Sequence, residues 1–324
     1  MLVSRPEMRC LNPDQKDTFK LPKHNIHETP MQANLNELNR EAIEASKEYT
    51  GELAWLTIGL TAFVLGAMVL LLWLFAAENL SLWIAIPAYA ALTYMSYTPL
   101  HEAVHSNIHG KHEHLKWVND LCGYLVAALI MVPYSTHKVE HFTHHRYTNQ
   151  PDKDPDYVVS NMRHGFFSFV ASGFHFLWVQ ITFLFRDYWK TTSLKDRAIY
   201  LAEIALTVAW RVAFGLLVGT AEVAWLLVGG YLIGAFFTAY WFAYRPHHPY
   251  DNVNRYQNTN SLIVPVWMKP LEWFWLGQNL HSIHHLFPRV PFYHYHALHR
   301  KIEPVLRAHG TPIVGIFSRQ RVGE

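Results

Sequence analysis

The chain has 324 residues, a formal net charge of only +2, and 51% hydrophobic residues. Nucleic-acid binding requires a concentrated basic face, so this balance argues against that class of function. The two cysteines, Cys10 and Cys122, are far apart, which excludes a disulfide framework and a thiolate metal site. The 22 histidines are the compositional anomaly.

The N-terminal 50 residues are polar and begin with no apolar run, so no cleavable signal peptide is expected. We predict a polar segment over 1–50 and a membrane domain over 51–324. Four predominantly apolar runs then reach the roughly 20 residues that a bilayer crossing needs. These predicted spans are 53–77, 81–100, 198–219 and 223–244.

Two further apolar segments are predicted to be interfacial helices. Segment 121–134 is too short to span, and 165–185 contains Ser168, Ser172 and His175. Seven lysines and arginines precede the first span, whereas the short connections 78–81 and 220–222 carry none. The positive-inside rule therefore places the N-terminus, the region 101–197 and the C-terminal tail in the cytoplasm.

Three histidine clusters have the sequences "HEAVH", "HFTHH" and "HSIHH". The first follows the second predicted span directly, the second comes after segment 121–134, and the third comes after the last pair of spans. Spacings of three and four place the rings of each cluster on one face of a helix. Two HxxHH motifs together with an HxxxH motif are a strong signal for a metal site, and neutral imidazole suits zinc, copper, iron and nickel. With four spans, all three clusters emerge on the same side of the membrane.

The clusters contain more ligands than one ion accepts, so two metal ions are predicted. Their members are His101, His105, His141, His144, His145, His281, His284 and His285. The motif "AYRPHHPYDN" adds His247 and His248 just past the fourth span, and one of them is expected to complete the set. The predicted fold is an all-α integral membrane protein with four transmembrane helices, interfacial helices and a cytoplasmic histidine-rich cap.

The ligand chemistry favours oxidation over hydrolysis. Hydrolytic two-metal sites usually include bridging carboxylates, and these clusters hold few. An all-imidazole site beside lipid fits iron and dioxygen acting on unactivated C–H bonds. The chain has no GxGxxG motif, flavin signature or iron–sulfur cysteine spacing, so its electrons must come from a separate protein.

From about residue 55 to about 315, the boxes and their order resemble the membrane fatty acid desaturase superfamily of di-iron enzymes. The stretches "LGQNLHSIHHLFPRVPFYHYH", "YRPHHPYDNVNRYQN" and "HHRYTNQPDKDPDYV" look closest to its β-carotene ring hydroxylase branch. The resemblance implies two non-haem irons, dioxygen as co-substrate, a lipid or carotenoid substrate, and a donor of ferredoxin, rubredoxin or cytochrome type. It makes the eight clustered histidines iron ligands and His247 the ninth. Glu102, His248 and Phe287 depart from the branch pattern.

Several other polar residues have weaker assignments. The resemblance matches His109 to a further histidine of the first box, with its role left open. His137 is expected to support the ligands or lie at the surface, and Gln278 and Asn279 to hydrogen-bond ligand rings. The aspartates of "DKDPD" (152–156) are typical of turns and helix caps. Arg211, in a predicted span, either contacts a substrate channel or is satisfied by backbone carbonyls inside the bundle.

The favoured function is hydroxylation of a β-carotene-type ring, and desaturation of a fatty acyl lipid is the close alternative. The two reactions share one oxidant, so the sequence separates them poorly. A histidine-based metal transporter is a more distant alternative, because a transporter should place ligands near the bilayer midplane. Here the four predicted spans contain no histidine.

Overall fold

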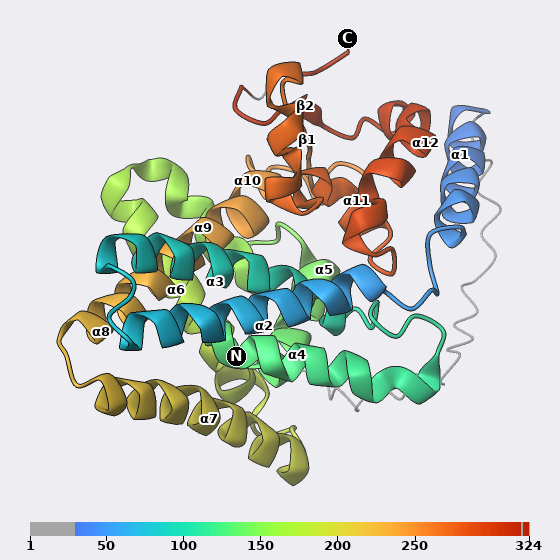
Figure 1. Cartoon of the computed structure of the whole chain (residues 1–324). Helices are drawn as coiled ribbons and strands as arrows, with labels where there is room; N and C mark the ends of the chain where they lie inside the picture. Colours follow the sequence, from blue (N-terminus) through green and yellow to red (C-terminus); the bar gives the residue numbers. More distant parts are fainter. Residues whose placement is uncertain (1–29, 319, 324) are drawn as a thin grey trace, which may run out of the picture.

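The structure is a computed structural model that describes residues 30–318 and 320–323, and it is mostly helical (Figure 1). Short 3-10 or π-helical segments are labelled η. The first half contains α1 (Pro30–Lys47), α2 (Trp55–Ala76), α3 (Leu82–Val104), η1 (Glu113–Leu115), α4 (Lys116–Ile130), α5 (Tyr134–Tyr147), η2 (Pro155–His164), α6 (Phe166–Phe183) and η3 (Leu184–Tyr188). The second half contains α7 (Leu194–Val218), α8 (Glu222–Ala224), η4 (Trp225–Gly230), α9 (Tyr231–Thr238), η5 (Ala239–Tyr244), α10 (Arg245–His247), β1 (Ser261–Ile263), η6 (Val266–Trp275), η7 (Gln278–Leu280), α11 (His281–Leu286), η8 (Phe292–His294), α12 (Tyr295–Ala308) and β2 (Ile313–Gly315).

Four helical stretches of the described chain are long and apolar enough to cross a bilayer. They are Trp55–Ala76, Phe166–Tyr188, Leu194–Val218 and Glu222–His247. Three of these overlap predicted spans, which confirms those runs as apolar helices of spanning length. Local features explain where α7 begins and ends. The Ser193 side chain caps its start by accepting a hydrogen bond from the Asp196 amide, and Gly219 ends the helix with a φ of 70°.

The fourth apolar stretch, Phe166–Tyr188, is not the span that the sequence predicted. The predicted span 81–100 forms the 23-residue helix α3, yet no stretch of α3 reaches the hydropathy expected of a membrane span. Its C-terminal half carries tyrosines, threonines and His101, and these are buried against neighbouring helices. Segment 165–185, predicted to be interfacial, has the length and apolarity of a span, because its few polar residues are outweighed by phenylalanine and other apolar residues.

The predicted interfacial segment 121–134 does not form a spanning helix by itself. Helix α4 has 15 residues and so extends about 23 Å, less than the roughly 30 Å of a hydrocarbon core. The chain turns by 96° between Glu113–Ile130 and Tyr134–Tyr147. This turn directs α5 toward the end of α3 that carries the first histidine cluster.

Close packing of α3 against α9 holds the centre of the bundle together. A Cβ atom added at Gly234 would meet the carbonyl oxygen of Ala90 at 2.5 Å and the Cβ of Thr93 at 2.7 Å. The two backbones therefore approach more closely than any side chain at this position allows. Around this contact, buried residues of α2, α3, α6, η4 and α9 contribute to the largest apolar core, which includes Met68, Tyr89 and Leu226.

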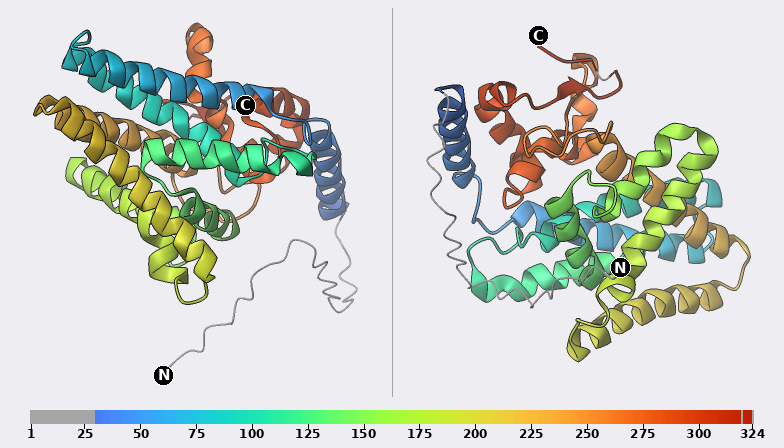
Figure 2. Two further views of the ribbon diagram at one scale, coloured as in Figure 1. Left: turned by 60° about the horizontal axis from the view of Figure 1, so that its bottom comes forward. Right: turned by 180° about the vertical axis from the view of Figure 1, so that it is seen from behind.

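The C-terminal part forms a cap at one end of the long helices (Figures 1 and 2). The cap contains a two-stranded parallel sheet that pairs Ser261 with Ile313 and Ile263 with Gly315, so the all-α prediction is wrong in this detail. Each strand has three residues, too few for alternating hydrophobicity to reveal it. Arg245 holds β2 in place by donating to the carbonyls of Gly315 and Ile316.

Helix α1 packs on this cap, with Ala42 fully buried in a core shared with α11 and α12. The Tyr256 hydroxyl donates to Asn39 at 2.8 Å, and Lys301 pairs with Glu48. Residues 1–29 of the predicted polar segment lie outside the described residues.

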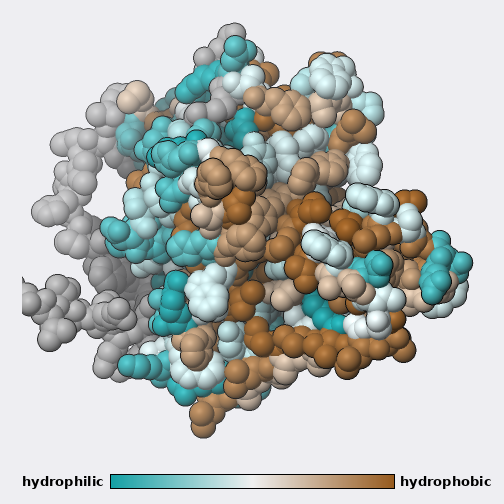
Figure 3. All heavy atoms as spheres, turned by 90° about the vertical axis from the view of Figure 1, so that its left-hand side faces the viewer, coloured by the Kyte–Doolittle hydropathy of each residue, from teal (hydrophilic) through white to brown (hydrophobic). Residues whose placement is uncertain are grey.

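Figure 3 shows hydrophobic side chains gathered over the lower part of one face, at the level of α7. Leu201, Leu206 and Leu216 of α7 are among the exposed large hydrophobic residues.

Candidate metal centre

Four separate chain segments bring nine predicted ligands together where the cap meets the helices. His101 lies in the last turn of α3 and His105 follows directly, with its amide bonded to the His101 carbonyl. Helix α5 contributes three histidines, α10 one and α11 three. They are His141, His144, His145, His247, His281, His284 and His285. All are buried except His145, which is partly exposed.

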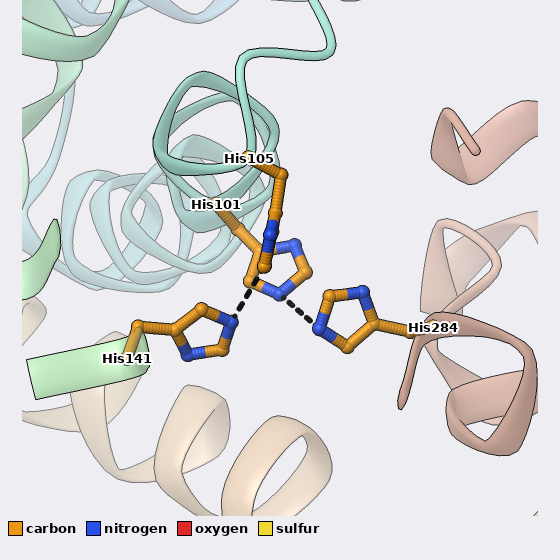
Figure 4. Close-up of side chains that lie close together, drawn as sticks. All are labelled: His101, His105, His141 and His284. Carbon is orange, nitrogen blue, oxygen red and sulfur yellow. Dashed lines mark hydrogen bonds between the residues drawn. The ribbon is translucent and has the colours of Figure 1, made fainter. Parts of the chain in front are cut away.

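The ligand nitrogens fall into two groups of four. His101, His105, His141 and His284 form the first tetrad, with the ligand atoms within 4.8 Å of one another (Figure 4). The second tetrad consists of His144, His247, His281 and His285. Two ions were predicted from the number of ligands alone, and the structure presents two groups of suitable size.

His145 lies between the two tetrads. Its Nε2 is 3.1 Å from Nε2 of His141 and 2.8 Å from Nε2 of His284. It also groups with His284 and His285, one residue from each tetrad. His145 therefore lies close to ligands of both tetrads.

Short contacts between ring nitrogens indicate cation ligation better than hydrogen bonding. In addition to the His145 contacts, Nε2 of His101 is 3.0 Å from His284, and Nε2 of His105 is 2.9 Å from His141. Each Nε2 offers one hydrogen or one lone pair, so these successive contacts cannot all be hydrogen bonds. Nitrogens about 2.1 Å from one ion are separated by about 3.0–3.4 Å. The observed distances are close to that range.

The protonation states of the third cluster suit ligation. Burial lowers the pKa of His281, His284 and His285 well below its usual value, and neighbouring imidazoles lower it further. The rings are therefore neutral, with a lone pair available for a metal. An all-nitrogen donor set suits zinc, copper, iron or nickel.

Asp154 holds the ring of His144 through the ring nitrogen Nδ1. Its carboxylate accepts from His144 Nδ1 at 2.8 Å and from the amides of Asn149 and Asp156 at 2.8 and 2.9 Å. Burial lowers the pKa of His144, but Asp154 and Asp156 outweigh this and raise it to about 9. A carboxylate on Nδ1 fixes the tautomer that turns Nε2 toward the ion and increases its basicity.

Two further rings are held through Nδ1. His284 contacts the Tyr295 hydroxyl at 3.1 Å, and His247 contacts the side-chain oxygen of Asn149 at 3.3 Å. Nε2 of His247 is buried without a hydrogen-bond partner, as expected for a nitrogen reserved for a ligand. These contacts fix ring orientation, so the centre is preorganised by its surroundings.

The sequence did not assign these supporting roles. Asp154 was expected only as a turn or cap residue, and it does cap η2 in addition to bonding His144. Asn149 and Tyr295 were not singled out. A usable signal was the position of "NQPDKDPD" directly after the second cluster, because a buried aspartate close to ligand histidines is a common partner of their outward nitrogens.

The weaker candidates lie around the centre and outside both tetrads. His109 is buried with Nε2 3.7 Å from Glu113. His137 bonds through Nδ1 to Gln180 at 2.9 Å and to Glu140 at 3.1 Å, and a group with Glu140 and His141 could also hold an ion. His248 is absent from the metal-binding groups of the described residues.

Gln278 and Asn279 were expected to bond ligand rings, and the described contacts are different. Both side chains are buried. Asn279 donates to the carbonyl of Leu262 and to Glu272. The amide atoms of Gln278 have no hydrogen-bond partner among the described residues.

The fold and the site define a helical protein with apolar helices of spanning length and two adjacent four-histidine sites. A family model described as "Fatty acid desaturase" matches residues 77–317, and the chain belongs to that family. The family consists of oxygen-dependent di-iron oxidoreductases, and the histidine groups are consistent with it.

Curated relatives share low identity over most of the chain. An sn-2 acyl-lipid omega-3 desaturase (ferredoxin) of Helianthus annuus is 24% identical over 71% of this chain, and the match spans 58% of the relative's length. An endoplasmic reticulum omega-3 fatty acid desaturase of Nicotiana tabacum is 23% identical, over 71% of this chain and 68% of its own. An sn-1 oleoyl-lipid 12-desaturase of Anabaena variabilis is 24% identical, over 68% of this chain and 69% of its own.

Proposed function

We propose that this protein is an acyl-lipid desaturase whose nine histidines hold two iron ions. The observation that carries the proposal is the meeting of histidines from four distant segments in two buried tetrads. Such a ligand set binds two transition-metal ions without bridging carboxylates, which favours redox chemistry over hydrolysis.

The relatives favour desaturation over the hydroxylation that the sequence motifs had favoured. The proteins described above are named acyl-lipid and fatty acid desaturases. Both reactions begin by removing hydrogen from an unactivated carbon, so the metal site alone does not distinguish them. We therefore prefer a fatty acyl lipid as the substrate and retain the β-carotene-type ring as the alternative.

The chain's own residues would bind and orient the ions. When bound, the iron pair supplies, together with dioxygen, the oxidant for the C–H bonds. Each tetrad would hold one ion, His145 lies between the tetrads, and Asp154 and Tyr295 keep their ligand rings in place. Burial of the ligands excludes bulk water, which protects a reactive oxidant from side reactions.

An apolar pocket beside the centre marks where an acyl chain would approach. Tyr97 lines this pocket together with Phe176, Leu177 and Ala235. The Tyr97 ring lies 5.8 Å from the His101 ring and 5.4 Å from the His137 ring. The pocket has a volume of about 20 Å³, so these side chains must move before an acyl chain enters.

We also propose that the centre faces the cytoplasm and receives electrons from a separate protein. The excess of lysine and arginine ahead of the first span supports this orientation. The name of the Helianthus annuus relative specifies ferredoxin, which supports a donor of that type. His145 is the one partly exposed residue among the nine predicted ligands.

Expression in a membrane host that makes monounsaturated acyl lipids tests the proposal. We expect new double bonds in extracted acyl chains, detected by mass spectrometry, and two irons per purified chain. The double variant His284→Ala/His285→Ala should lose both the new double bonds and the two irons. Immunoblotting checks that the variant and the unsubstituted chain are expressed at similar levels. Feeding β-carotene to the same host separates the alternatives, since ring-hydroxylated product without new acyl double bonds would overturn the desaturase assignment. Zinc without iron, and no oxygen consumption, would favour the transporter alternative.

A further inference from the structure

Two charged residues of α7 lie in a helix that otherwise faces outward. Only 6% of the most apolar 18-residue stretch of α7 is buried, and the buried residues of the whole helix are Tyr200 and Thr207. Glu203 and Arg211 belong to this same helix face, about two turns apart. A charge inside a span costs about 2.5–3.5 kcal/mol on insertion scales, so each needs a compensating contact.

Both contacts are at the bend between α4 and α5. Helix α4 ends at Ile130, Met131 adopts a left-handed conformation with φ 56°, and α5 begins after Pro133. A bend of 96° leaves the last carbonyls of α4 and the first amides of α5 without partners inside their own helices.

Glu203 binds the beginning of α5. Its carboxylate accepts from the Tyr134 amide at 2.6 Å and from the Ser135 amide at 3.2 Å, and it also accepts from the Ser135 hydroxyl. A carboxylate is the favourable charge at a helix N-terminus, where the macrodipole is positive.

Arg211 binds the end of α4. It donates to the carbonyls of Ala128 and Leu129, and Trp210 also donates to Ala128 at 3.0 Å. The guanidinium lies over the Trp210 ring, 4.3 Å from its centroid. A cation is favourable at a helix C-terminus, so each charge of α7 matches the helix end it contacts. The two terminal nitrogens of Arg211 are thus bonded to backbone carbonyls, whereas its Nε has no hydrogen-bond partner among the described residues.

We propose that Glu203 and Arg211 are positioning residues for the metal centre, which they influence through the direction of α5. This proposal depends on the proposed function, because it requires the centre to bind metal. Helix α5 supplies His141 to the first tetrad, His144 to the second, and His145 between them. His144 is about 15 Å along the helix from Tyr134. A tilt of about 4° at the start of α5 would move that ring by about 1 Å, whereas ligand distances tolerate about 0.2 Å.

Iron retention in the full-length protein tests the proposal. Purified chains are loaded with ⁵⁷Fe(II), dialysed against a chelator, and measured for iron per folded chain and for their Mössbauer spectra. We expect Glu203→Ala and Arg211→Met to lose iron roughly 10-fold faster than the unsubstituted chain, with broadened spectra. Glu222→Gln is the matched control, because Glu222 lies exposed at the start of α8. It should behave like the unsubstituted chain.

The outcomes separate this proposal from the proposed function. An unsubstituted chain that binds no iron removes both. Two irons in the unsubstituted chain, with unchanged retention and spectra in both α7 variants, overturn the positioning role alone. If Glu203→Ala does not fold, Glu203→Gln replaces it, since it keeps the side-chain volume and one acceptor oxygen. A role limited to folding stability would lower the melting temperature of Glu203→Gln and leave its iron retention unchanged, which would also overturn the proposal.

Discussion

Replacing Asp154 with asparagine should weaken one of the two metal sites and leave the other intact. The Asp154 carboxylate accepts three hydrogen bonds, from His144 Nδ1 and from the amides of Asn149 and Asp156. Asparagine keeps one acceptor oxygen, and its NH₂ group faces either the Asn149 amide or both the His144 ring and the Asp156 amide. At least one bond and the negative charge are lost.

The expected magnitude follows from the role of the lost group. Removing an outer partner of a ligand histidine typically lowers metal affinity by about 10- to 100-fold, which corresponds to about 1.4–2.8 kcal/mol. His144 belongs to the second tetrad alone. Asp154→Asn should therefore reduce retained iron from two ions to one per chain under chelator concentrations that leave the unsubstituted protein loaded.

Metal analysis after graded chelation is the assay, and Asp152→Asn is the control. Asp152 is exposed and close in sequence, so the control removes the same charge without disturbing the buried network. Equal chelator resistance in Asp154→Asn and Asp152→Asn would refute the reasoning. Loss of both irons together would show that the two tetrads do not respond separately.

Three further predictions follow from the same structure. His109→Ala should retain two irons and nearly full activity. His284→Ala should lose activity by several hundred-fold or more, because His284 belongs to the first tetrad and also contacts His145. The iron content and the product yield of the two variants are measured side by side. Gly234→Ala should destabilise the protein by about 1–3 kcal/mol through overpacking against Ala90, whereas Gly229→Ala, with no atom within 4 Å of the added Cβ, should be neutral or slightly stabilising in thermal unfolding. Complete removal of iron should lower the melting temperature by several degrees, since a ligand at 100 times its Kd stabilises by about 2.7 kcal/mol per site, and restoring iron should reverse the change.

The ligand set could be inferred from sequence because it depends on helical spacing. Histidines at intervals of three and four share a face wherever the helix lies, and adjacency to spans indicated which end of the bundle they reach. His247 lacks such a pattern, and its assignment needed the family resemblance. His137 has the right spacing but turns Nδ1 to Gln180, a contact with α6 that no local pattern encodes.

The prediction was weaker where tertiary contacts decide the outcome. The second half of α3 is polar but buried, because it faces other helices. Helix α6 is apolar enough to span a bilayer despite its serines. The partners of Glu203 and Arg211 lie on the two sides of the 96° bend between α4 and α5, and no residue pattern in α7 reveals that bend. The three-residue strands were missed because pairing, and not periodicity, defines them.

The ligands come from positions 101 to 285, and this spread affects how long the protein persists in a cell. Ions bound at the two tetrads would join distant parts of the chain, so a molecule synthesised during iron shortage would lack these cross-links and keep a cluster of unmatched imidazoles in its interior. Such a molecule opens more often and is degraded sooner. We expect iron supply to set the cellular amount of this protein as well as its turnover number.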